Sequence, residues 1–176
     1  MKETLENIAR EIGFEYTGVT EASNLQTLPE VRDMCASGTC QVYGKSWACP
    51  PACGPIEEFQ QKIDQFDNCF VVQTVGQMED EFDFETIMET SEKHKERFTE
   101  FALRVSELDA KTMFLAAGTC TICKECSYPD APCRFPDKCM SSMEAAGLVV
   151  ADVCTKAGVE YNHGKNTMAY SSCVLY

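Results

Sequence analysis

Several features that would assign the chain to a common functional class are missing from its sequence. Neither the Gly-x-Gly-x-x-Gly pattern of dinucleotide-binding folds nor the phosphate-binding loop of nucleotide hydrolases occurs. No stretch approaches the roughly 18 consecutive apolar residues that a membrane-spanning helix needs. We also find no tandem repeat and no low-complexity tract. These absences argue against the usual modes of nucleotide binding and against a membrane span, but they leave open a flavin or corrinoid site, which often lacks a short signature.

Basic residues are scarce. The chain has 15 Lys and Arg against 28 Asp and Glu, a formal net charge of −13, and no cluster of basic side chains. Such a chain repels nucleic acids and anionic membrane surfaces, so we expect neither as a partner. A basic partner surface fits this charge, although an acidic surface can also serve solubility alone.

A secretory signal is missing as well, because the first residues lack a basic start followed by an apolar run. We therefore expect a cytoplasmic protein, whose thiols stay reduced. Against this background the 12 cysteines among 176 residues stand out. A chain of this length can fold without disulfides, so the cysteines are expected to bind metal.

The pattern of apolar residues predicts helices and strands that alternate along the chain. Helical spacing is found at 4–12, 56–66 and 85–108, and a short helix is expected at 142–146. Strand patterns occur at 15–20, 69–75, 111–117 and 167–175, while 148–156 fits either a helix or a strand. We expect one α/β domain over residues 1–176, with α+β possible. It would have a small mixed sheet flanked by helices, and cysteine-rich loops at about 33–54 and 118–140.

The strongest motif is a run of three cysteines in the second loop, at Cys120, Cys123 and Cys126, followed by Cys133. Three thiolates at this spacing suit three corners of a [4Fe–4S] cluster, and ferredoxins use the same triple with a more distant fourth cysteine. We predict that these four residues bind one such cluster, with Cys139 as a spare fourth ligand. A zinc site, which usually pairs two separated cysteine knuckles, and redox-active thiols stay as alternatives.

The first loop holds a second constellation, Cys35, Cys40, Cys49 and Cys53, whose spacing matches no simple ligand signature. Four cysteines in a loop interrupted by prolines still indicate a site, which we predict to be a second cluster. Zinc and no metal at all are the alternatives. Trp47 is close enough in sequence to cover a cluster from water, although it can equally be a core anchor.

Together these motifs resemble a family of predicted metal-binding proteins of bacteria and archaea, known as a domain of unknown function. The resemblance is carried by Cys40-x-x-Tyr43-Gly44-Lys45-x-Trp47-x-Cys49-Pro50-Pro51, by the triple-cysteine loop, by Pro132-Cys133-Arg134-x-Pro136 and by Ser142-Met143-Glu144-Ala145-x-Gly147. It covers nearly the whole chain. It implies metal binding, with iron–sulfur as the expected form, and it implies no substrate.

The leading functional hypothesis is an iron–sulfur protein that carries electrons between two clusters and docks a redox partner protein of unknown identity. An enzyme with an open iron site is the first alternative, and a structural zinc adaptor is the second. The enzyme would need acid–base groups, for which the candidates are His94, Asp83, Glu85 and Glu144.

The other cysteines are expected to be structural, whereas His94 is expected to be either a core histidine or a ligand or proton donor beside a cluster. The helical stripe that contains His94 predicts that this side chain faces the interior. Cys69, Cys154 and Cys173 occur in apolar segments and are expected to be small core residues.

Overall fold

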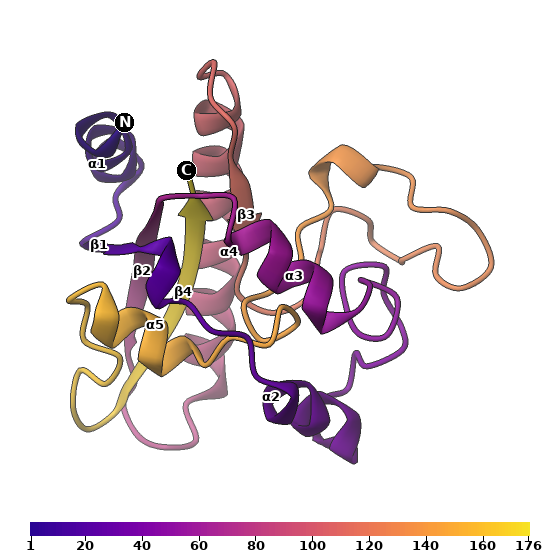
Figure 1. The fold of residues 1–176 in the computed structure, drawn as a ribbon. Coiled ribbons are helices and arrows are strands. Elements are labelled where there is room, and N and C mark those ends of the chain that lie inside the picture. Colours follow the sequence, from indigo (N-terminus) through magenta and orange to yellow (C-terminus); the bar gives the residue numbers. More distant parts are fainter.

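The computed structural model describes residues 1–176 apart from the side chain of Thr39. Its centre is a four-stranded sheet in the order β1-β2-β4-β3, in which every pair of neighbours is antiparallel (Figure 1). The strands are β1 (Tyr16–Glu21), β2 (Asn68–Gln77), β3 (Met113–Leu115) and β4 (Thr167–Leu175). The long central pair β2 and β4 is in register from Cys69 opposite Leu175 to Gln77 opposite Thr167.

The sheet corrects one expectation and selects the α+β form of the predicted fold class. A mixed sheet was expected because helices and strands alternate along the chain. Instead, the C-terminal strand β4 lies between β2 and β3 and is antiparallel to both. Strands β2 and β3 therefore run in the same direction, but they do not pair with each other because β4 lies between them. No two neighbouring strands of the sheet are parallel.

Helices and turns cover both faces of the sheet. The helices are α1 (Lys2–Ile12), α2 (Pro29–Met34), α3 (Ile56–Ile63), α4 (Phe84–Ser106) and α5 (Val150–Lys156). Helices α1 and α4 pack on one face, where Phe101 stacks on Phe70 of β2 and Phe98 stacks on Phe101 within one apolar cluster. Helices α3 and α5 cover the other face, together with the turn at residues 141–148. Both layers share the one sheet, so the chain forms a single α+β domain.

The predicted elements with clear periodicity are confirmed: α1, α3, α4, β1, β2 and β4 lie within a few residues of their expected positions. The ambiguous stretch at 148–156 forms helix α5. The strand expected at 111–117 is shorter, at Met113–Leu115.

Two local expectations are wrong. Residues 142–146 form a turn instead of a helix; the Ser142 hydroxyl accepts a hydrogen bond from the Ala145 amide at 3.0 Å, but the chain reverses at Gly147 before a helix can extend. The cysteine-rich loop expected at about 33–54 begins in the last residues of the short helix α2 and continues through a π-type turn at Cys35–Thr39.

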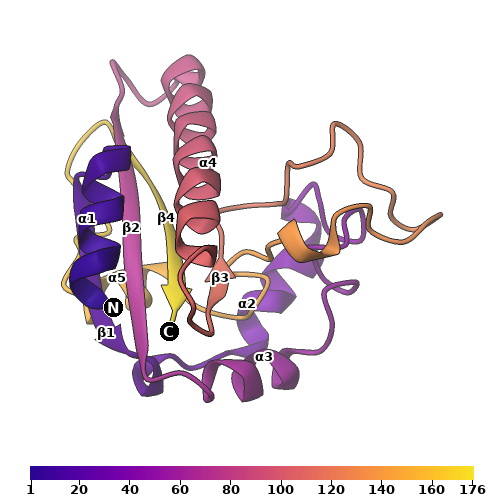
Figure 2. The same ribbon diagram turned by 90° about the horizontal axis from the view of Figure 1, so that it is seen from above.

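The two cysteine-rich loops lie side by side at one edge of the molecule. Figures 1 and 2 show the segment at 118–140 projecting away from the sheet, next to the segment that links α2 to α3. Among the described residues, no helix is long and apolar enough to cross a membrane.

Candidate metal centres

Five cysteines of the second loop line one pocket. They are Cys120, Cys123, Cys126, Cys133 and Cys139, so the pocket gathers all four predicted cluster ligands and the spare candidate. Ser46 and Trp47 of the first loop complete its wall. The tight spacing of the triple brings its members together, whereas Cys133 and Cys139 reach the pocket because the loop folds back on itself.

Hydrogen bonds favour the thiolate form of two of these cysteines. The Cys139 thiol and the backbone amides of Ile122 and Met140 bond to Cys120 and lower its pKa to about 6, against the effect of burial. The same contact with Cys120 raises the pKa of Cys139, as does burial. The Cys120 thiolate thus accepts a hydrogen bond from the Cys139 thiol at this wall of the pocket. Because thiolates are the metal-binding form, Cys120 is prepared for a metal.

Cys126 is influenced by the first loop. Burial acts to raise the pKa of Cys126, but the amides of Tyr128 and Trp47 and the hydroxyl of Ser46 hydrogen-bond to its sulfur, and together they lower that pKa. Amide groups that point at ligand sulfurs also tune the electronic properties of a bound cluster. The first loop therefore contributes to the second cysteine site.

Within the first loop, three cysteines lie near one another. Burial raises the pKa of Cys35 most, and the neighbouring groups Cys40, Glu144 and Cys49 raise it further. Cys49 is buried, and its sulfur lies 3.2 Å from the Thr119 hydroxyl oxygen of the second loop. Burial also raises the pKa of Cys49, and the neighbouring Cys40 and Cys120 raise it further. The first-loop site thus lies directly beside the second.

Cys53 has a different environment, because an arginine holds its sulfur. Arg32 of α2 donates from Nη2 to Cys53 Sγ at 3.6 Å, from Nη1 to the Gly54 carbonyl at 2.6 Å, and from Nε to the Ala145 carbonyl at 2.8 Å. Burial raises the pKa of Cys53, and the Arg32 charge acts against it. The ligand role of Cys53 stays a prediction. Arg32 itself escaped the sequence reasoning, since no motif marks it.

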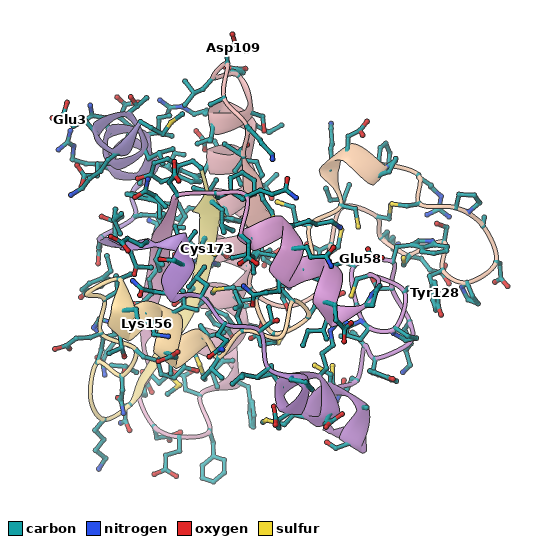
Figure 3. The ribbon with its side chains drawn as sticks, viewed as in Figure 1. Glu3, Glu58, Asp109, Tyr128, Lys156 and Cys173 are labelled. Atoms are coloured by element: carbon teal, nitrogen blue, oxygen red, sulfur yellow. The ribbon has the colours of Figure 1, made fainter. Side chains whose placement is uncertain are left out.

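Aromatic contacts join the two loops. Trp47 donates from Nε1 to the Ala131 carbonyl at 3.0 Å, and its ring meets Tyr128 edge-on with centroids 5.0 Å apart. Figure 3 shows Tyr128 on the projecting second loop, on the side that faces the segment before α3. Trp47 thus covers the pocket wall, as expected for a residue that shields a site, while Tyr43 is partly exposed.

The donor set decides which group these sites fit. Among the side chains that the structure describes, no three His, Cys, Asp or Glu residues are already placed around a single metal ion. The thiols of the pocket instead bond to one another, so their side chains must turn toward a metal when it binds. Thiolate-rich sets favour iron–sulfur clusters, zinc and Cu(I), and the nine cysteines of the two loops fit this chemistry.

The structure places the acid–base candidates in different environments. His94 is only 1% exposed, which confirms that it faces the interior. Its Nδ1 lies 3.0 Å from the Thr74 hydroxyl and its Nε2 lies 2.7 Å from the Ser172 hydroxyl. A small cavity separates His94 from Cys120. Asp83 instead caps α4 by accepting from the Thr86 amide at 3.0 Å.

Glu144 lies at the first cysteine site, on the turn at 141–148. Its Oε2 is buried and is the one buried side-chain nitrogen or oxygen atom without a hydrogen-bond partner among the described side chains. The three cysteines outside the loops, Cys69, Cys154 and Cys173, are fully buried, which confirms them as core residues.

Comparison with known proteins agrees with the metal-binding expectation. The model of the family described as "Predicted metal-binding protein (DUF2284)" matches residues 19–176. No curated protein matches the chain. Among solved structures, a selenomethionine-labelled epoxyqueuosine reductase aligns with a TM-score of 0.43 and 12% identity, over 98% of this chain. The chain spans only 45% of that protein's length.

Proposed function

Since the chain belongs to the DUF2284 family of predicted metal-binding proteins, we propose that it is an iron–sulfur protein that transfers electrons inside the cell. In this proposal Cys120, Cys123, Cys126 and Cys133 hold one [4Fe–4S] cluster. A second metal centre, also a cluster, is held by the first loop through Cys35, Cys40 and Cys49, with Cys53 as their predicted companion.

The observation that supports this most directly is the single pocket lined by the second-loop cysteines. A cubane needs several thiolates that approach from different directions, because each binds a different iron. The loop supplies such directions by turning back after Cys126, and backbone amides already point at the sulfurs of Cys120 and Cys126.

Electron transfer is favoured because the two cysteine loops touch. The contact between Cys49 and Thr119, next to Cys120, would bring two centres into close proximity, and neighbouring clusters exchange electrons readily. The net charge of −13 suits a redox partner with a basic surface and disfavours nucleic acid. The partner's identity does not follow from these features.

A second candidate function is an enzyme with an open iron at the first loop. The contact of Cys53 with Arg32 favours it, because a sulfur held by a guanidinium leaves three cysteines for a cluster. An iron that lacks a protein ligand can bind substrate. Glu144, which acts on Cys35, is then the acid–base candidate at this site, while His94 lies across a small cavity from Cys120 of the second loop.

The proposal is tested by measuring iron, zinc and acid-labile sulfide in anaerobically purified protein, before and after Cys123→Ser. We expect iron and sulfide in the parent, and loss of the cluster of the second loop in the variant. Cys154→Ala is the matched control, because Cys154 is fully buried on α5 and its sulfur meets the Ser171 hydroxyl of β4. Stoichiometric zinc in protein made with ample iron, or unchanged iron in Cys123→Ser, would contradict the proposal.

A further inference from the structure

The buried carboxylate of Glu144 is the most unusual polar group among the described side chains. Its Oε2 has lost its contact with water and has gained no hydrogen-bond donor in exchange. Buried polar atoms nearly always have a partner, and a charged oxygen needs one most. An unpartnered carboxylate oxygen therefore marks a place where a positive group is expected.

The nearest arginine is not that group. Arg32 uses Nε, Nη1 and Nη2 for the Ala145 carbonyl, the Gly54 carbonyl and the Cys53 sulfur. Among the described side chains, the three ion pairs all lie elsewhere, at residues 2 and 6, 11 and 104, and 152 and 156. No described side chain thus pairs with Glu144 Oε2, which leaves this oxygen available to a positive group from outside the chain.

Glu144 faces the first-loop cysteines. Its charge is one of the causes that raise the pKa of Cys35, alongside those of Cys40 and Cys49. The carboxylate and these three sulfurs thus lie near one another, from different segments of the chain, without yet being placed around a single metal ion. Sulfur and carboxylate oxygen both serve as ligands of iron and of zinc.

The backbone keeps Glu144 and Cys35 in fixed relation. The start of α2 is tied to the Glu144 turn by the Leu28 amide, which donates to the Gly147 carbonyl at 2.7 Å, and Arg32 ties its middle to Ala145. Cys35 follows directly after this helix. On the other side, the Met143 amide donates to the Ala116 carbonyl at the end of β3. The carboxylate is therefore positioned by the sheet and by α2 together.

We propose that Glu144 supplies an oxygen ligand to the metal centre held by Cys35, Cys40 and Cys49, as its fourth ligand in place of Cys53. The inference rests on the proposed function. It gives the centre a mixed set of three sulfurs and one oxygen, and so makes one metal chemically distinct from the others.

The test compares metal retention in the parent and four variants, all purified anaerobically. Glu144→Gln removes the charge at nearly constant shape, and Glu144→Asp keeps the carboxylate but shortens its reach. Glu3→Gln is the matched control, since Glu3 is exposed on α1, far from the cysteine loops (Figure 3). Cys40→Ser reports whether the first loop binds metal at all. Iron released to a chelator is followed over time and over chelator concentration.

We expect Glu144→Gln to release first-loop iron at a chelator concentration at least about tenfold lower than the parent needs, since even outer residues of metal sites change affinity by 10–100-fold. Glu144→Asp should fall between them, and Glu3→Gln should match the parent. As a measurement that needs no variant, ⁵⁷Fe Mössbauer spectra of the parent should contain an iron subsite unlike those ligated by sulfur alone.

Two failures are distinguishable. If Cys40→Ser keeps all its iron, the first-loop centre of the proposed function is wrong, and the role of Glu144 falls with it. If Cys40→Ser loses iron while Glu144→Gln retains it like the parent, and the parent shows only sulfur-ligated iron, Glu144 is not a ligand and the proposed function stands without it.

Discussion

The environment of His94 makes its contribution to stability strongly dependent on pH. Burial, followed by the charges of Arg97 and Lys95 on the same helix, lowers its pKa from 6.5 to about 3. Its ring nitrogens meet only the hydroxyls of Thr74 and Ser172, on β2 and β4. No carboxylate offsets the cost of charging the ring, so the folded protein keeps it neutral.

The sign of the effect follows from proton binding. Between pH 6.5 and about pH 3 the unfolded chain binds a proton at this residue and the folded chain does not. The stabilisation by His94 is therefore complete above pH 6.5 and is lost as the pH falls through this window. For a pKa of about 3 against 6.5, the loss between pH 7 and pH 5 is about 2 kcal/mol.

Urea unfolding followed by circular dichroism at both pH values measures this loss. The parent should lose about 2 kcal/mol more of its free energy of unfolding than His94→Gln, whose amide can meet both hydroxyls but does not titrate. His163→Gln is the matched control, since it removes the chain's other histidine and leaves His94 in place. Equal losses in the parent and in His94→Gln would refute the argument.

Two further substitutions probe the first loop and the Glu144 turn. If Glu144 takes the fourth ligand position in place of Cys53, Cys53→Ala should leave the first-loop iron and its paramagnetic spectrum unchanged; loss of iron would show that Cys53 is a ligand and would return the centre to four cysteines. Gly147→Ala should destabilise the fold by roughly 1–3 kcal/mol in urea unfolding, because φ is +86° and the new Cβ would lie 2.4 Å from Ile56 Cδ1. Gly158→Ala shares a positive φ, at +74°, but has no atom within 4 Å, so an equal loss there would show that the contact with Ile56 is unimportant.

The fold could be predicted where packing on the sheet imposes a period on the sequence. The stripe that contains His94, Phe98 and Phe101 places α4 on the sheet, and the apolar run of β2 marks the central strand. The direction of β4 could not be predicted, because strand order depends on contacts between segments far apart in the chain. Helix α2 was missed because it has six residues and no buried side chain, so nothing imposes a period on it.

The candidate site was predictable only in part, for a similar reason. The spacing of Cys120, Cys123 and Cys126 is a local feature of the sequence, and it was sufficient to predict that these residues share a site. In the structure all three line one pocket. The role of Arg32 depends on its contacts with Cys53 and Ala145, which are 21 and 113 positions away in the sequence. No local pattern records contacts over such separations. Glu144 was named as an acid–base group, but its unpartnered oxygen becomes visible only once the chain is folded.

The same physics suits the placement of the candidate metal-binding thiols in irregular segments. Amides within helices and strands are already used by the backbone, as around the buried Cys69 and Cys173 in the sheet. In the loops the amides of Ile122, Met140 and Tyr128 are free to point at sulfur, and they lower the pKa of the thiols they meet. A site that must hold several thiolates close together needs such donors to offset their mutual repulsion. The lack of periodicity in both cysteine loops therefore fits the proposed metal binding, because it leaves backbone amides free to point at sulfur.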